Sequence, residues 1–301
     1  MSHKKCFSWK YYFTLSVILL LAVGWGAPSA LAQNRDSGQA ETPTIEEKTT
    51  DMQKIDGFFP LYWDEKAGTL WMEIARFDTE VLNLGGLAAG LGSNDIGLDR
   101  GQGGGSRIVT FERVGPKILM VQPNYRYRAI SDNPDEVRAV TDAFARSTHW
   151  GFKVAAETDG RVLVDMTDYL IRDTHRVIPR LRPGAYRLDK SRSAVYMPMT
   201  MGFPKNTELE VSLTFTLSSG GGGRGFGGGG GGFESPGRVA ASGDAVTLRV
   251  HHSFVELPDD NYTPRLYDPR SGYGALTYQD YATPLGESMT KRFIRRHRLE
   301  K

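Results

Sequence analysis

Apolar and polar side chains alternate without a break from Glu208 to Leu217. Successive side chains of a strand point to opposite faces of a sheet, so this pattern predicts a strand with one buried and one solvated face. The segment from Ala245 to Val255 repeats the alternation in phase. Together they predict a long hairpin, whose connection contains a glycine tract, residues 220–232, that we expect to be disordered.

Shorter hairpins recur along the rest of the chain, because apolar runs flank residues typical of turns. Two helices are also expected: residues 134–146, where Asn133, Pro134 and Glu136 match a helix start, and residues 286–298. The fold class predicted is therefore mainly β (α+β), with antiparallel sheets built from hairpins, sandwich-like or partly rolled, and one or two short helices. The predicted hairpins pair residues 58–63 with 69–74, 107–114 with 117–122, and 152–157 with 161–166.

The N-terminus has the pattern of an export signal. Basic side chains precede an apolar run at residues 12–23, and Ala30-Leu31-Ala32 is typical of a signal peptidase site. The run is shorter than the about 20 residues that span a bilayer. We therefore expect a signal peptide at residues 1–32 and export to the periplasm or the extracellular space, with no membrane association after cleavage.

Four further regions are predicted after the signal. Residues 33–51 are polar and are expected to be a disordered linker. A small β-hairpin region (52–98), a β-rich domain (99–290) and a basic C-terminal tail (291–301) follow it. The tail could contact anionic lipid or an acidic partner surface, or could simply be solvated.

Composition excludes several functions. The single cysteine, Cys6, lies in the expected signal, so a mature chain would have no thiol nucleophile and no cysteine zinc site. The formal net charge is +2, and loss of three signal lysines would leave 34 basic against 35 acidic side chains. This balance argues against a general nucleic-acid partner.

Motifs for hydrolysis and phosphate binding are not found. No histidine is followed by glutamate, so the chain contains no H-E-x-x-H zinc motif. It also contains no G-x-S-x-G elbow and no G-x-x-x-x-G-K-[ST] loop. The glycine-rich segment 90–102 matches neither nucleotide fingerprint and is expected to be a long ordered loop. The segment has side-chain oxygens that could hold Ca²⁺, from Asn94, Asp95, Asp99 and Gln102. Their spacing differs from that of the EF-hand loop.

One cluster could bind a divalent metal if its side chains converged. It comprises Asp165, Asp168, Asp173 and His175, which supply oxygen and imidazole donors within eleven residues. The alternative, which we favour, is that the acids cap a short helix at 167–172 and its flanking turns.

Two adjacent histidines, His251 and His252, should lie on opposite faces of their strand and so cannot chelate one ion. His252 shares its face with Val250 and Phe254, which predicts a hydrogen-bonded core histidine. His251 is expected on the polar face beside Arg249 and Ser253.

Long motifs throughout the chain resemble one family, the exported bacterial zinc-dependent metalloproteases, whose N-terminal regions comprise two successive domains of unknown function. The similar segments include GFFPLYWDEKAGTLWMEI (57–74), VTFERVGPKILMVQPNYRYRA (109–129), WGFKVAAETDGRVLVDMTDYLIRD (150–173), FPKNTELEVSLTF (203–215) and RVHHSFVELPDDNYTPRLYDPRSGY (249–273). The resemblance implies that zinc and the H-E-x-x-H helix belong to a separate C-terminal catalytic domain, missing here. No catalytic or cofactor-binding residue is therefore carried onto this chain.

Two functions remain open. The first is an accessory, non-catalytic region that docks onto a metalloprotease catalytic domain and guides a peptide or protein substrate; this predicts an exposed apolar patch near the C-terminal segment. The second is a free-standing exported binding or structural module without enzymatic activity. A third, weaker hypothesis is a hydrolase that uses Asp165, Asp168, Asp173 and His175.

Overall fold

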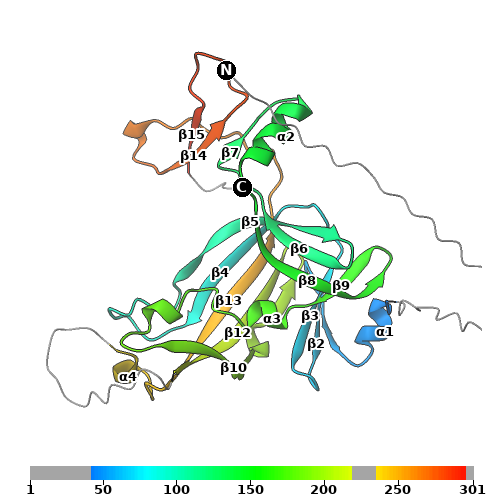
Figure 1. Ribbon diagram of the computed structural model, residues 1–301, viewed down its shortest axis with the longest axis vertical. Coiled ribbons are helices and arrows are strands. Elements are labelled where there is room, and N and C mark those ends of the chain that lie inside the picture. The colour runs from blue at the N-terminus through cyan, green and yellow to red at the C-terminus, as the bar shows by residue number, and fades with distance from the viewer. Residues whose placement is uncertain (1–41, 219–234, 296–301) are drawn as a thin grey trace, which may run out of the picture. The chain divides into compact units, whose positions relative to one another are not determined.

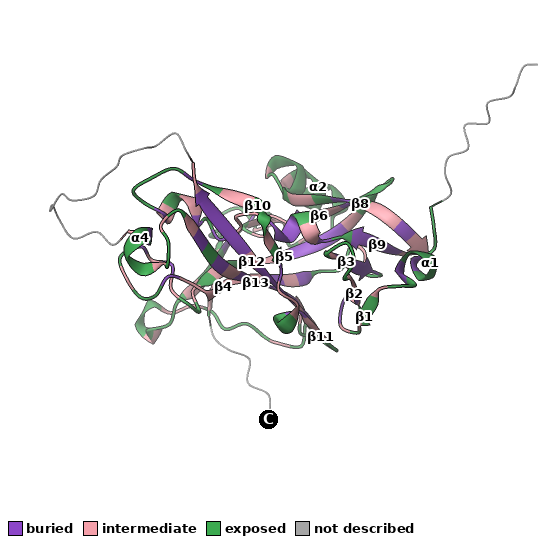
Figure 2. Cartoon of the chain, turned by 90° about the horizontal axis from the view of Figure 1, so that it is seen from below, coloured by how far each residue is buried: buried purple, intermediate pink, exposed green. Residues whose placement is uncertain are grey.

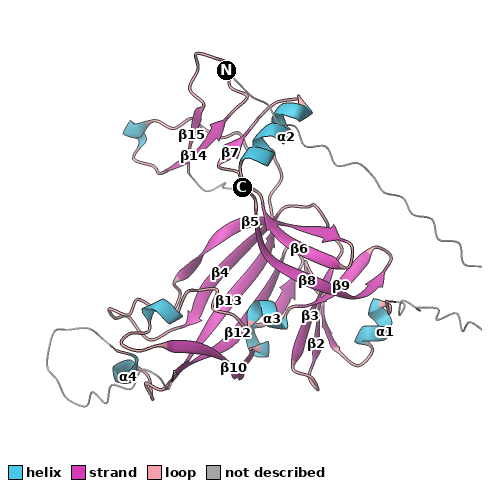
Figure 3. Ribbon diagram, in the orientation of Figure 1, coloured by secondary structure: helices cyan, strands magenta, loops and turns pink. Residues whose placement is uncertain are grey.

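Strands dominate the computed structural model of the protein, which describes residues 42–218 and 235–295 (Figure 3). The predicted signal peptide and the glycine tract at 220–232 lie outside the described residues. From Thr42 onward the chain clusters as one compact unit. The expected division near Leu98 does not separate two units, because strands from both sides of it share one sheet.

The larger sheet has twelve strands in the order β1-β2-β3-β9-β8-β6-β5-β4-β13-β12-β10, with β11 beside β12 (Figure 1). All its neighbouring strands are antiparallel, which confirms the predicted fold class. The strands are β1 (Gln53–Ile55), β2 (Leu61–Asp64), β3 (Thr69–Ile74), β4 (Val81–Ala89), β5 (Gly103–Val114), β6 (Lys117–Gln122), β8 (Ser147–Thr158), β9 (Arg161–Asp165), β10 (Tyr186–Val195), β11 (Met201–Phe203), β12 (Asn206–Leu217) and β13 (Ala245–Glu256).

All four predicted hairpins are present: β2–β3, β5–β6, β8–β9 and β12–β13. The turn of β8–β9 places Asp159 and Gly160 at positive φ, 50° and 76°. Glycine adopts this conformation without steric cost, and Asp tolerates it better than most residues. Local turn chemistry therefore favours the β8–β9 pairing.

The larger sheet curls on itself. Phe59, just before β2 near one end of the strand order, lies 5.5 and 5.9 Å, between ring centroids, from Phe111 of β5 and Phe254 of β13 in the core. The backbone of Phe59 also exchanges two hydrogen bonds with the Thr207 hydroxyl of β12, at 2.9 and 3.0 Å. The curl buries one continuous apolar face (Figure 2).

The second face of β12 is also buried, so the prediction that it is solvated is wrong. Glu210 is 2% exposed, and Thr214 and Thr216 are buried as well. Thr214 Oγ1 donates to the Arg192 carbonyl at 2.8 Å, because the chain around β10 folds back over this face. The alternating pattern identified the strand but not what covers its polar side.

Part of the expected linker is ordered, which corrects that prediction for residues 42–51. Helix α1 (Ile45–Thr49) begins with a complete capping box between Thr44 and Glu47. Ile45 is 1% exposed and packs with residues of β2, β8 and β9. A single apolar anchor in a polar segment was too weak a pattern to indicate docking.

A second, three-stranded sheet contains β7 (Tyr127–Arg128), β14 (Ala275–Asp280) and β15 (Thr290–Ile294), with β7 parallel to β14. The predicted helix at 286–298 is wrong, because residues 290–294 pair with β14 instead. Thr290 and Ile294 are β-branched and suit a strand. The predicted helix at 134–146 is present as α2 (Pro134–Ala143), capped by the Asn133 side chain. The other short helices are α3 (Thr167–Leu170), α4 (Pro236–Val239) and 3₁₀ turns at Ile178–Arg180, Met197–Met199 and Pro269–Ser271.

Candidate functional site

Exposed large apolar side chains gather on the three-stranded sheet, α2 and their connections, which we call the small-sheet face. Eight of the twelve such side chains among the described residues lie there, although this part is much the smaller share of the chain. They are Ile130, Val137, Leu266, Tyr273, Leu276, Tyr281, Leu285 and Met289. Scattered apolar residues are normal on any surface, whereas a concentration marks an interaction site.

This region forms regular secondary structure without a core of its own. Neither cluster of buried apolar residues includes a residue of α2, β7, β14 or β15. Only Tyr278 and Asp280 are buried in the described parts of residues 124–146 and 257–295, and α2 buries no residue (Figure 2). Since helices and sheets in proteins are stabilised mainly by burial of one face, this region lacks the usual source of stability.

Helix α2 and β7 enclose a groove of about 250 Å³. The apolar stripe of α2, predicted from the sequence, lines it through Val137, Val140 and Phe144, together with Tyr127 and Ile130. The ring of Phe144 stacks on Tyr127 with centroids 4.0 Å apart. The stripe therefore faces an open groove and not a packed core.

Polar contacts hold the small-sheet face together. The buried carboxylate of Asp280 accepts the backbone amides of Ile130 and Ala282 at 3.0 and 3.2 Å. The Arg128 guanidinium packs 4.5 Å from the Tyr278 ring centroid. The β15 residue Arg292, expected in a basic tail, lies 4.3 Å from the Tyr267 ring. These contacts fix the backbone while they leave the apolar side chains exposed.

Two of the four candidate metal ligands, Asp165 and Asp173, accept backbone amides of short turns as in the capping alternative, whereas Asp168 and His175 have other partners. Asp165 Oδ1 accepts the Thr167 amide at the start of α3, at 2.8 Å. Both oxygens of Asp173 accept amides of the 3₁₀ turn that begins at Ile178, at 2.7 and 2.9 Å. Asp168 pairs with Lys190 at 2.7 Å, and His175 contacts Gln102 at 3.1 Å. In the described parts of the chain, no group of three or more His, Cys, Asp or Glu is placed to hold a metal ion.

The loop at 90–102 is ordered and inserted into the core, as the plainer interpretation predicted. Its apolar residues Leu91, Ile96 and Leu98 are buried. The Asn94 side chain closes the turn, donating to the Leu91 carbonyl at 2.7 Å and accepting the Ile96 amide at 3.0 Å. Of the residues proposed for Ca²⁺, Asn94 thus serves the loop itself and Gln102 contacts Arg180 and His175, whereas Asp99 Oδ1 is buried without a hydrogen-bond partner in the described residues.

The two strand histidines occupy opposite faces, as predicted. His252 is 3% exposed and lies in the core. His251 bonds through Nε2 to Glu208 Oε2 at 2.6 Å, and the Ser253 hydroxyl donates to the same oxygen. The part played by Glu208 was missed, because it depends on the register of β12 with β13, which places Glu208 opposite Ser253 and diagonal to His251.

The Glu208 and His251 pair should make stability depend on pH. The hydrogen bond to Glu208 raises the pKa of His251. Burial raises the pKa of Glu208, but hydrogen bonds from His251, Ser253 and Asn206 outweigh it and lower the pKa overall. A raised histidine pKa stabilises the fold below about pH 6.5, and this contribution is lost as pH rises through the folded-state value. The Glu208 contribution is lost only as pH falls through its lowered value.

We therefore expect His251→Gln to lower the free energy of unfolding by about 1–2 kcal/mol near pH 6 and by less near pH 9. Urea unfolding at several pH values measures this difference. His149→Gln is the matched control with the opposite sign, because burial and Arg107 lower the pKa of His149. A His251→Gln effect that grows with pH would contradict the assignment.

Among the described residues, no helix is long and apolar enough to cross a membrane. The fold is that of a mostly β protein built on one long antiparallel sheet, with a second sheet of three short strands. The family described as "Domain of unknown function (DUF5117)" matches residues 101–301, and the chain belongs to that family. No curated protein and no solved structure matches the chain.

Proposed function

We propose that this protein is an exported accessory module whose small-sheet face docks onto the zinc-binding catalytic domain of a metalloprotease. The observation that carries the proposal is a region that lacks a core and exposes eight large apolar side chains, of which Val137 lies on α2, Leu276 on β14 and six on the connecting segments. A partner domain packed on this face would supply the missing burial, at roughly 25 cal/mol for each Å² of apolar surface.

The chemistry of the partner follows from the resemblance of the sequence motifs to exported zinc-dependent metalloproteases. In that arrangement zinc and the general base belong to the partner domain. The module contributes a docking surface and a groove beside α2 in which part of a partner or an extended substrate could lie. Export is part of the same proposal. The mass of the mature protein would test whether the chain is cleaved after Ala32.

The direct test mixes the purified protein with a separately produced catalytic domain that carries an H-E-x-x-H helix. Leu276→Glu places a charge in the small-sheet face and should weaken binding about tenfold or more in calorimetry. Val114→Glu is the matched control, since Val114 is also on a strand and is 55% exposed, against 51% for Leu276, but lies outside the face.

Binding that depends on Leu276 and not on Val114 supports the proposal. Equal effects of the two substitutions, or no interaction of the unchanged protein with the catalytic domain, would refute it. A second candidate function, a free-standing exported binding module, is favoured by a separate feature: a polar cavity beside α3.

A further inference from the structure

A cavity of about 120 Å³ lies between β4, β5, β13 and the segment that follows α3. Its polar lining comes from Asn83, Arg107, Arg172, Thr174, His175 and His252. The two histidines are buried, at 6% and 3% exposed, whereas Arg107, Arg172 and Thr174 are partly exposed. Arg107 also lines a second pocket, which borders Leu276 and Tyr278 of β14.

The two guanidinium groups are held in place by their neighbours. Arg172 packs against the rings of Trp150 and Tyr169, 4.9 and 4.4 Å from their centroids, and its Nε donates to the Tyr169 carbonyl at 2.8 Å. Arg107 donates to His149 Nδ1 at 3.2 Å. A guanidinium fixed by stacking and hydrogen bonds loses little further freedom when it binds a ligand.

The histidines around the cavity have defined tautomers. Since Arg107 only donates, His149 Nδ1 must accept, and its Nε2 donates to Gln122 at 2.7 Å. Gln102 Oε1 accepts from Arg180 at 2.6 Å, so His175 donates to the same oxygen from Nε2. Burial, followed by the charge of Arg172, lowers the pKa of His252 to about 3. His252 is therefore neutral, and the arginines carry the charge of the site.

No carboxylate balances this charge. The cavity lining contains no Asp or Glu, and neither Arg107 nor Arg172 forms an ion pair with any acid in the described residues. The nearby Asp173 is engaged with the amides of Val177 and Ile178. Arg107 and Arg172 are partly exposed, and two like charges that border one cavity without an acid raise the local concentration of a small anion there.

We propose that this cavity binds a carboxylate group through Arg107 and Arg172. The planar guanidinium matches a carboxylate with two parallel hydrogen bonds, and the volume suits a group of a few heavy atoms. Gly104 keeps the space open beside His175, because a Cβ at this position would lie 2.9 Å from His175 Nδ1. The carboxylate comes from a small free acid or from the C-terminus of a peptide.

Calorimetry of the full chain with acetate, with a short peptide that has a free C-terminus, and with its amidated form tests the proposal. Acetate binding supports a small acid, and binding of the free but not the amidated peptide supports a peptide terminus. Arg107→Met and Arg172→Lys should each weaken binding about tenfold or more, whereas Arg138→Met, on the exposed face of α2, should not.

Arg172→Lys retains the charge, so a folded variant that binds weakly separates carboxylate recognition from a loss of structure. Far-ultraviolet circular dichroism confirms that each variant is folded. The proposal is overturned if neither acetate nor the free peptide binds, or if Arg138→Met weakens binding as much as Arg107→Met does.

Discussion

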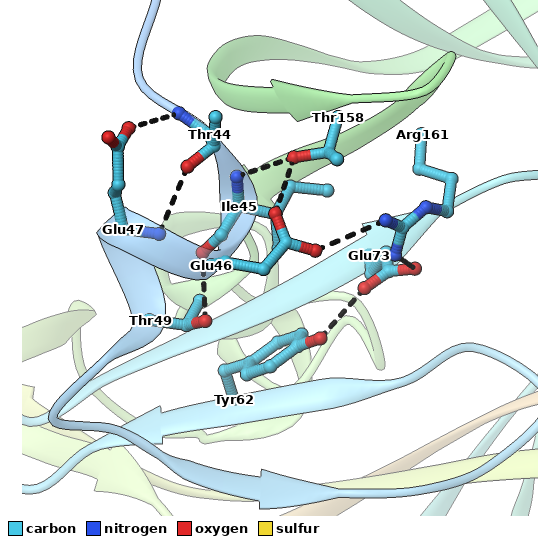
Figure 4. A network of polar contacts seen from close by, with 9 residues as sticks. All are labelled: Thr44, Ile45, Glu46, Glu47, Thr49, Tyr62, Glu73, Thr158 and Arg161. Carbon is cyan, nitrogen blue, oxygen red and sulfur yellow. Dashed lines mark hydrogen bonds and ion pairs between the residues drawn. The ribbon is translucent and has the colours of Figure 1, made fainter.

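Arg161→Met is expected to lower the free energy of unfolding by about 3 kcal/mol or more, because it leaves a buried carboxylate unpaired. Figure 4 shows the arrangement: Glu73 on β3 accepts from Arg161 at 2.9 Å and from the Tyr62 hydroxyl at 2.8 Å. Glu73 is 5% exposed, so water cannot replace the lost partner. The hydrogen bond to Glu73 also raises the pKa of Arg161, which keeps the guanidinium charged.

Arg161 also joins α1 to the sheet, since it donates to Glu46 at 3.1 Å (Figure 4). Urea unfolding measures the loss, and Arg161→Met/Glu73→Leu should recover much of it by removing the unpaired charge. Arg138→Met is the control, because the ion pair of Arg138 with Asp135 is exposed on α2. Its loss should lower the free energy of unfolding by less than about 0.5 kcal/mol. A loss for Arg161→Met no larger than this control would show that Glu73 does not depend on Arg161.

Gly202→Ala is expected to lower the free energy of unfolding by about 1–3 kcal/mol or more, as other overpacking substitutions do. A Cβ on Gly202 would lie 2.1 Å from the Asp56 carbonyl oxygen and 2.8 Å from the Gly57 Cα. Both neighbours are backbone atoms, so no side chain can turn away to relieve the overlap. The segment between β1 and β2 is held against β11 by the hydrogen bond from the Phe58 amide to the Phe203 carbonyl at 2.8 Å.

Gly103→Ala is the matched control for this clash. Gly103 has no atom within 4 Å of a built Cβ, so alanine should change stability little there. Thermal and urea unfolding of the two variants should differ clearly. If Gly202→Ala lowers the free energy of unfolding no more than Gly103→Ala does, then β11 and the segment between β1 and β2 are not in close contact in solution.

The hairpins and the fold class could be read from the sequence because their pairings are local. A turn residue such as Gly160 and the alternation in residues 208–217 act over a few positions, and the structure keeps both. The pairing of β4 with β13 joins residues about 170 positions apart. No local pattern encodes such a contact, since it depends on how separate hairpins associate.

Only part of the candidate site was predicted from the sequence. The apolar stripe of α2 was predicted, but its exposure to an open groove follows from the absence of packing partners in the described chain. The strand at 290–294 was mistaken for a helix, because its pairing with β14 outweighs a weak helical pattern. The cavity arginines were not predicted, since Arg107 and Arg172 are far apart in the sequence and line one cavity only in the folded protein.

The amino-acid sequence by itself determined an antiparallel β protein, the position of its hairpins and the capped helix α2. Turn residues and side-chain alternation act between near neighbours, so they carry this information locally. Only the tertiary structure decided which faces remain exposed and which charges become buried together. Both depend on contacts between residues far apart in the chain, and these contacts form only when the sheet curls around its core.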